Sequence, residues 1–288
     1  MMPDTAEIRL GTSAFTIAGW QGSFYPAGLQ PRDFLSYYAT KFDTVEIDST
    51  FYRCPSRSTV QGWYNKTPKD FVFAAKVPRE ITHERMLVEC EAQCREFFST
   101  MEILGEKLGP LLLQFGYFNR DIFADGDEFL ARLVPFLEKL PKDRRFALEI
   151  RNKYWLTQRF ADALRKHGVA LVLQDQSWMP RPREYFEKLD PITADFTYIR
   201  WLGDRKAIEE ITKSWDKTVV DRTAEIGEWT EIIHKVQERR IKIYGYVNNH
   251  FAGHAPATID LLRTALGLPS PFQPELQLPF ESPTGEEE

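Results

Sequence analysis

Residues 44–50 read T-V-E-I-D-S-T, and this stretch indicates both how the chain folds and where its polar groups lie. Alternate residues of a β-strand point to opposite faces. Val45 and Ile47 therefore share one face, and Glu46 and Asp48 share the other. If the apolar pair packs against helices, both carboxylates point to the far side of the sheet. The stretch predicts a buried strand whose carboxyl end carries charge.

Seven other runs along the chain resemble this one in length and composition. Each has five to seven residues and is rich in Val, Ile, Leu, Phe or Tyr, as buried parallel strands are. The eight predicted strands are Ile8–Ser13, Thr44–Asp48, Phe71–Val77, Leu111–Phe115, Phe146–Arg151, Val169–Gln174, Phe196–Leu202 and Lys242–Asn248. Helical patterns lie between them, at Pro31–Phe42, Ser58–Asn65, Val88–Leu108, Asp127–Leu140, Thr157–His167, Thr223–Arg239 and Pro256–Leu266. Only Ser177–Asp190 has little helix signal, because Pro180 and Pro182 interrupt it.

Eight strands separated by helices predict an α/β fold of the (β/α)8 TIM-barrel type. A doubly wound open sheet shows the same alternation and is the alternative fold. The sequence has no G-x-G-x-x-G or GK[ST] motif, so no nucleotide cofactor is indicated. We predict a single barrel domain over residues 8–268, an N-terminal extension over 1–7 and a loosely ordered Pro- and Glu-rich tail over 269–288.

Composition excludes several classes of protein. The chain has 37 basic and 42 acidic side chains, and the whole excess of acids lies in the tail, so the body is neutral. A neutral body excludes a general polyanion-binding surface but allows a local basic site. With 43% hydrophobic and 14% aromatic residues, the chain can form a large core. Because it shows no transmembrane run, no signal peptide and only three cysteines, we predict a cytoplasmic protein without membrane association.

Polar or charged residues end seven of the eight predicted strands, at the face where barrel active sites lie. On the fifth strand, for example, Glu149 and Arg151 share a face by the period of two. An unpaired charge inside a barrel is costly, so these groups must pair with one another or face a ligand. One hypothesis is a structural ion-pair network without chemistry. The one that we favour is a site for a polar ligand.

Seven motifs give the chain a family likeness. They are G-W-Q-G-S-F-Y-P-A-G-L around Trp20, T-V-E-I-D-S-T-F-Y-R-C-P (44–55), F-V-F-A-A-K-V-P-R-E-I-T-H (71–83), L-L-L-Q-F (111–115), A-L-E-I-R-N-K-Y-W (147–155), Y-I-R-W-L-G (198–203) and Y-G-Y-V-N-N-H (244–250). In these motifs the chain resembles the DUF72 (YecE-like) family, TIM barrels of unestablished activity. The resemblance covers roughly residues 8–266.

The resemblance implies a site built from polar residues of these motifs. They are Glu46, Ser49, Tyr52, Lys76, His83, Gln114, Glu149, Arg151, Arg200, Asn248 and Asn249. The chain departs from the family pattern at three places: Asp48 stands where the family usually has Asn, Gly116 where it has Pro, and Leu202 where it tends to have His. Asp48 therefore adds a negative charge to the predicted site.

The favoured function is an enzyme with hydrolase- or isomerase-like acid–base chemistry on a small anionic substrate that contains phosphate or sugar. Such chemistry needs two titratable groups with separated pKa values, and we predict Glu46 and Glu149 for these roles, with Lys76 as a third catalytic residue. The predicted substrate-binding residues are Ser49, Tyr52, His83, Gln114, Arg151, Arg200, Asn248 and Asn249.

The loops after the last two strands suggest an anion site. They contain Gly203, Arg205 and Lys206, then Asn248, Asn249 and Gly253. Phosphate sites of barrels commonly lie there, and free backbone N–H groups before a helix favour an anion.

Two alternative functions remain open. One is a non-catalytic binding protein for a phosphorylated metabolite or, less favoured, for nucleic acid. The other is a divalent-metal-dependent phosphodiesterase- or isomerase-like barrel, with oxygen and nitrogen ligands from Glu46, Glu149, Asp175, His83 and His250. Because nearby cations compete for these carboxylates, no residue is predicted as a metal ligand. The cofactor and the oligomeric state stay unassigned.

Overall fold

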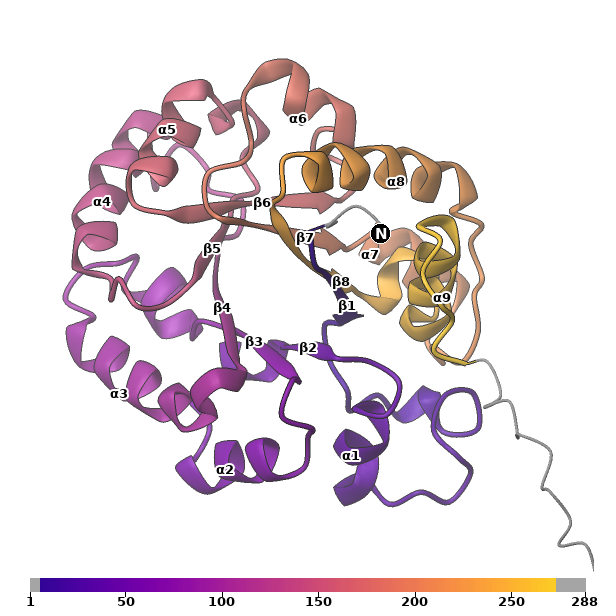
Figure 1. Cartoon of the computed structure of the whole chain (residues 1–288). Helices are drawn as coiled ribbons and strands as arrows, with labels where there is room; N and C mark the ends of the chain where they lie inside the picture. Colours follow the sequence, from indigo (N-terminus) through magenta and orange to yellow (C-terminus); the bar gives the residue numbers. More distant parts are fainter. Residues whose placement is uncertain (1–5, 273–288) are drawn as a thin grey trace, which may run out of the picture.

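Eight parallel strands follow one another around a nearly closed barrel in the computed structural model, which describes residues 6–272 (Figure 1). The strands are β1 (Ile8–Thr12), β2 (Thr44–Ile47), β3 (Val72–Lys76), β4 (Leu108–Gln114), β5 (Phe146–Glu149), β6 (Val169–Asp175), β7 (Phe196–Trp201) and β8 (Lys242–Val247). Their hydrogen-bonded order runs from β1 through β8, β7, β6, β5, β4 and β3 to β2. The predicted TIM barrel is confirmed, and the open-sheet alternative is wrong.

A tyrosine joins the two strands where the barrel closes. The hydroxyl of Tyr38 accepts a hydrogen bond from the backbone N–H of Thr12 in β1 (2.9 Å) and donates one to the carbonyl of Thr44 in β2 (3.1 Å). Tyr38 is fully buried, so an unpaired hydroxyl here would be unfavourable. The side chain thus completes the backbone hydrogen bonding across the seam.

Helices surround the barrel (Figure 1). They are α1 (Phe34–Tyr38), α2 (Arg57–Asn65), α3 (Glu91–Met101), α4 (Gly126–Lys139), α5 (Gln158–Lys166), α6 (Pro182–Lys188), α7 (Arg205–Ile211), α8 (Thr223–Glu238) and α9 (Ala255–Ala265). Short 3-10 helices lie at Ala18–Trp20, Pro31–Asp33, Asp48–Phe51, Glu102–Lys107, Lys153–Trp155 and Asn249–Phe251, and a π-helical turn lies at Glu80–Glu84. Ser56, Asp125, Thr157 and Asp204 each cap a helix by accepting hydrogen bonds from its first backbone N–H groups.

Two helical expectations were wrong. The segment Ser177–Asp190 contains α6, because Pro182 occupies the first helical position, where proline is favoured and breaks nothing. The side chain of Glu184 accepts the backbone N–H of Arg181 and closes that helix start. In addition, Arg205 and Lys206 begin α7 and do not belong to an open loop.

The barrel interior changes from apolar to polar along its axis. An inner cluster of ten apolar and aromatic side chains fills much of it: Val72, Ala74, Leu112, Ala147, Ala170, Val172, Phe196, Tyr198, Tyr244 and Tyr246. Farther toward the carboxyl ends, the residues of the same inward parity are Glu46, Lys76, Gln114, Glu149, Gln174 and Arg200, all buried. The fold thereby gathers polar groups from six strands at one end of the barrel.

The two chain ends lie partly beyond the described residues. The predicted N-terminal extension is described only at Ala6 and Glu7, and the predicted tail only at 269–272. Within residues 6–272, no helix is long and apolar enough to cross a membrane.

Candidate active site

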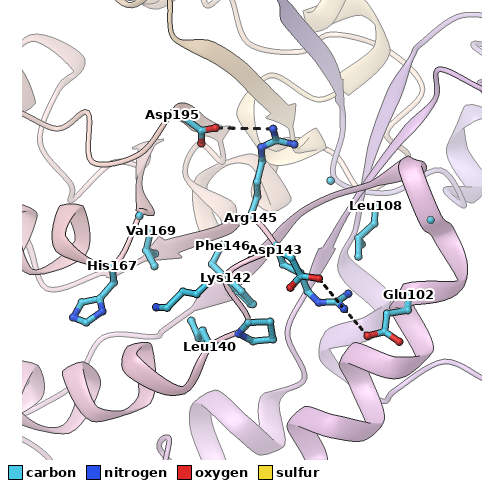
Figure 2. A pocket seen from close by; sticks show the side chains of 15 residues that line it. Glu102, Leu108, Leu140, Lys142, Asp143, Arg145, Phe146, His167, Val169 and Asp195 are labelled. Atoms are coloured by element: carbon cyan, nitrogen blue, oxygen red, sulfur yellow. Dashed lines mark hydrogen bonds and ion pairs between the residues drawn. The ribbon is translucent and has the colours of Figure 1, made fainter.

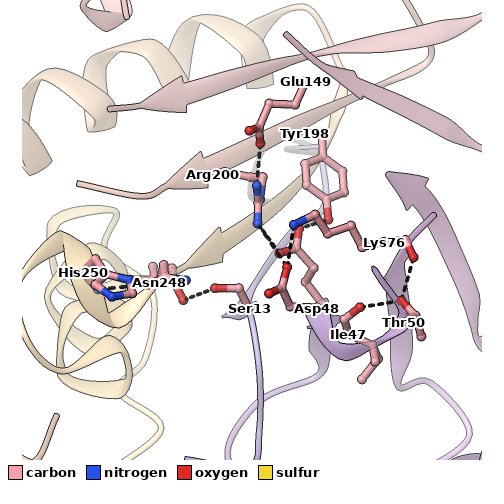
Figure 3. A network of polar contacts seen from close by, with 12 residues as sticks. Ser13, Ile47, Asp48, Thr50, Lys76, Glu149, Tyr198, Arg200, Asn248 and His250 are labelled. Carbon is pink, nitrogen blue, oxygen red and sulfur yellow. Dashed lines mark hydrogen bonds and ion pairs between the residues drawn. The ribbon is translucent and has the colours of Figure 1, made fainter. Parts of the chain in front are cut away.

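Arg200 lies between two carboxylates at the carboxyl end of the barrel (Figure 3). Its Nη2 donates to Oε1 of Glu46 at 2.7 Å, and its Nη1 donates to Oε2 of Glu149. All three side chains are almost completely removed from solvent. A buried charge is tolerated only when it is compensated, so each of these groups depends on the others.

Three further charges surround this trio and lie closer to solvent. Nζ of Lys76 contacts Oδ1 of Asp48 at 3.0 Å (Figure 3) and lies 4.1 Å from the centre of the Phe51 ring. Nε of Arg151 donates to Oε1 of Glu149 at 3.0 Å. The side chains of Asp48 and Arg151 keep 34% and 26% of their exposure, so they form the solvent-accessible edge. We call Glu46, Asp48, Lys76, Glu149, Arg151 and Arg200 the charged centre.

The two buried carboxylates have opposite pKa shifts although they share one guanidinium. Burial raises the pKa of Glu46, and the attraction of Arg200 only partly offsets this effect. Burial acts on Glu149 in the same sense, but Arg200 and Arg151 together lower the pKa of Glu149 to about 2. Two carboxyl groups whose environments separate their pKa values are suited to different roles in proton transfer.

The hydroxyl of Tyr198 donates to Oε2 of Glu46 at 2.6 Å. Burial raises the pKa of Tyr198 well above 10, and the charge of Glu46 acts in the same direction, so the phenol remains a donor. Tyr198 is not among the site residues predicted from the sequence. The strand period of two could have predicted it, because Tyr198 precedes Arg200 by two residues and therefore shares its inward face. Gln174, which also faces inward, leaves its Oε1 buried without a partner among the described residues.

Of the other predicted site residues, three lie around the Lys76 side of the centre. The His83 ring packs edge-on against Phe51, with ring centres 5.0 Å apart. Burial and the nearby cations lower the pKa of His83 to about 4, so the ring is neutral at neutral pH. Ser49 and Tyr52 are exposed in the turn after β2. Gln114 is buried in β4 beside Glu149, its register partner in β5.

The loops after β7 and β8 differ from the predicted anion site. The N–H of Gly203 donates to the carbonyl of Asp175 (2.9 Å), and the N–H of Gly253 donates to that of Asn249 (2.7 Å). The prediction of free N–H groups at these glycines is therefore wrong. The Asn249 side-chain oxygen accepts the N–H of Ala255, and that of Asn248 accepts the N–H of His250, so both asparagines order the chain before α9.

Two cavities help to place the site along the barrel axis. A small one, about 160 Å³, opens beside Asp48 and is also lined by Ser13, Asn248 and His250. A larger one, about 520 Å³, lies at the amino-terminal ends of the strands (Figure 2). There Arg144 pairs with Glu102. Arg145 pairs with Asp195, as Figure 2 shows. This larger cavity lies away from the charged centre.

The metal-dependent alternative lacks a suitable ligand group. Among residues 6–272, no three His, Cys, Asp or Glu side chains are placed to hold a metal ion together. Asp175 instead accepts a hydrogen bond from the indole of Trp229 in α8 (2.7 Å). His250 contacts Asn248 and Glu209. The carboxylates Glu46 and Glu149 are held by arginines.

Residues 9–279 match the family described as "Protein of unknown function DUF72". The chain belongs to the DUF72 family. A relative from Escherichia coli (strain K12), the UPF0759 protein YecE, is 25% identical over 235 residues, covering 71% of this chain and 84% of that protein. A DUF72 family protein of known structure, from Thermotoga maritima, is 27% identical with a TM-score of 0.69, covering 89% of this chain and 97% of that one. The DUF72 resemblance predicted from the motifs is confirmed.

The barrel of this DUF72 protein also resembles that of an enzyme. D-psicose 3-epimerase, solved in the presence of D-fructose, has a TM-score of 0.50 and 10% identity to this chain, covering 83% of this chain and 84% of that one. At that identity the likeness concerns the fold alone.

Proposed function

We propose that this DUF72 protein is an enzyme that transfers protons on a small anionic substrate at the charged centre. One observation supports this most strongly: Glu46 and Glu149 contact the same guanidinium, yet their pKa values are shifted in opposite directions. Glu46 would carry the mobile proton. Glu149 would stay ionised and keep Arg200 charged and in place. The reaction is of the hydrolase or isomerase type, on a substrate that contains phosphate or sugar.

The charges of the centre support an anionic substrate. The centre contains three carboxylates and three cations, so it is neutral when all six groups are ionised. A proton on Glu46 leaves one positive charge in excess, which an anion can compensate. Arg151 and Asp48, the partner of Lys76, lie at the edge that solvent reaches, and an anion bound to Lys76 would compete with Asp48. Because Asp48 and Glu46 both lie near Nη2 of Arg200, loosening Asp48 would expose Glu46 to the substrate.

Replacing Lys76 with Met should abolish most of the anion binding. The change removes the partner of Asp48 at the exposed edge, and we expect affinity to fall at least about tenfold, as loss of a charge-assisted hydrogen bond does. A thermal-shift screen against sugar phosphates and sugar acids, followed by calorimetry, measures this. Lys69→Met is the matched control, since Lys69 is exposed before the start of β3 while Lys76 ends that strand. Equal affinity in the Lys76 variant and the wild type would contradict the assignment.

Anion binding should strengthen as the pH falls. Burial raises the pKa of Glu46, and its protonated form gives the centre its positive excess, so binding takes up a proton. With a sugar sulfate, whose own charge is constant, we expect affinity to rise as the pH falls toward the raised pKa of Glu46, by at most about tenfold per pH unit. Glu46→Gln imitates the protonated form and should remove this pH dependence. An unchanged pH profile in that variant would mean that another group takes up the proton.

A second candidate is a binding protein without catalysis, and the complete burial of Glu46, Glu149 and Arg200 favours it. Both candidates predict anion binding, so product formation distinguishes them. Each ligand from the screen is incubated with the protein in D2O and followed by NMR. Deuterium incorporation or product that requires Glu46 supports the enzyme. Tight binding with neither supports the binding protein.

A further inference from the structure

A third cavity, about 690 Å³, opens beside the charged centre between the loops that follow β4, β5 and β6. Arg151 connects the charged centre to this cavity. Its Nε is bound to Glu149 inside the charged centre, and its side chain also lines this cavity. The rest of the guanidinium has no other partner among the described residues. A ligand held by Arg151 can therefore extend from the charged centre into the cavity.

Three large aromatic side chains on the lining of this cavity are exposed to solvent. Tyr117, Tyr154 and Trp178 are 70%, 84% and 46% exposed, and they come from the loops after three successive strands. Single exposed aromatic residues are common, but three around one cavity form an apolar lining that water covers poorly. Their flat faces and polar edges suit a ligand with one apolar face and several hydroxyls. We call the cavity lined by these three residues the aromatic cleft.

The floor of the aromatic cleft is preformed. The Phe118 and Trp155 rings stack there, with centres 6.1 Å apart. The Asn152 side chain binds the backbone of Phe118 in both directions, at 2.9 and 2.8 Å, and so fixes the two loops to each other. A Cβ on Gly126 would lie 2.9 Å from the Trp155 ring, so only glycine lets the indole lie against the start of α4. A ligand would therefore meet a surface that needs little ordering.

Unpaired charges in the aromatic cleft are positive. Lys153 and Arg120 line it, and neither has an acidic partner within residues 6–272. The acids of the lining are already engaged: Asp125 caps α4, and Asp127 pairs with Arg159. Together with Arg151, the aromatic cleft presents three cations to a ligand, which favours an acidic one.

We propose that the aromatic cleft binds a sugar ring that carries an acidic group, with the ring on the exposed aromatics and the acid toward Arg151 and Lys153. This proposal rests on the proposed function and names the substrate class of that site. An acidic sugar is favoured over an adenine nucleotide because free Asn or Gln amides are the groups that commonly read the edge of adenine. Here the Asn152 amide and the Asp125 carboxylate are both bound to backbone.

Calorimetry with four probes tests this proposal: glucuronic acid, glucose 6-phosphate, glucose and AMP. We expect the two acidic sugars to bind at least about tenfold more tightly than glucose and AMP. The double variant Tyr154→Ala, Trp178→Ala should weaken the acidic sugars roughly tenfold or more, and Lys153→Ala should weaken them less. Ile211→Ala, which removes an exposed apolar side chain at the end of α7, should change nothing.

Several results would overturn the proposal: equal binding of glucose, tighter binding of AMP, no binding of any probe, or acidic-sugar binding that the double variant leaves intact. Failure of the proposed function would look different. If the acidic sugars bind in the aromatic cleft and neither reacts nor exchanges deuterium, the binding proposal is supported and the proposed enzymatic function is wrong. If turnover occurs and the cleft variants do not change it, the proposed enzymatic function is supported and sugar binding in the aromatic cleft is wrong.

Discussion

Replacing Arg200 with Met should destabilise the protein by about 3–5 kcal/mol, because it leaves Glu46 without a cation in the barrel interior. Glu149 keeps Arg151, so the larger share of the loss comes from Glu46. Denaturant unfolding at neutral pH measures the free energy of unfolding. A loss below about 1 kcal/mol would mean that the trio is hydrated and exchanges freely with solvent, contrary to its burial.

Two further variants show how much of this loss of stability comes from uncompensated charge and how much from lost packing. The triple variant Glu46→Gln, Glu149→Gln, Arg200→Met removes all three charges of the buried trio, so it should recover much of the stability that Arg200→Met loses. Arg159→Ala removes an exposed ion pair with Asp127 and should change stability by less than about 1 kcal/mol. If the triple variant is no more stable than Arg200→Met, lost packing and not uncompensated charge accounts for the loss.

As the pH rises toward 7, Arg200→Met should lose stability more steeply than the wild type. In the wild type, the pKa of Glu149 is lowered to about 2 from its ordinary 4.5, so its contribution is complete above 4.5 and is lost as the pH falls toward 2. In Arg200→Met, burial without the guanidinium raises the pKa of Glu46 further. The cost of burying the ionised Glu46 carboxylate is then absent at low pH and grows as the pH rises. The two stabilities should therefore converge as the pH falls from 7 toward about 4.

Glu46→Gln should lower turnover by about 10²–10⁴-fold while the fold and anion binding remain. Glutamine has the same size and its oxygen can still accept from Arg200, but it has no proton to exchange. The measurement is kcat on the first substrate that the screen identifies, with unfolding and affinity determined on the same protein.

A control variant on the same strand shows whether the loss of turnover is specific to Glu46. Thr44→Ser is a suitable control, because Thr44 lies two residues before Glu46 on the same inward face and its hydroxyl binds Tyr246. That change should leave kcat within a few fold of the wild type. Unchanged turnover in Glu46→Gln would remove Glu46 from the reaction and leave Asp48, at the exposed edge, as the carboxylate to test next.

The sequence predicted the fold well because its signal is local. A buried parallel strand needs a short apolar run, and a barrel needs eight of them, so composition and spacing alone indicated the architecture. The period of two also identified which charges point inward, among them Glu46 and Glu149. The helix at Pro182 was missed because proline both interrupts helices and begins them, and only its position in the folded chain separates the two.

By itself, then, the amino-acid sequence determined the barrel, the family and the set of polar side chains at its carboxyl end. The tertiary structure alone decided how these side chains divide: Glu46 with Tyr198 and one side of Arg200, Glu149 with two arginines, and Asp48 with Lys76 near solvent. It also brought Tyr117, Tyr154 and Trp178 to one cavity. The reason is physical, since pKa values and cavities depend on burial and on distances between groups from different strands, which no spacing along the chain specifies.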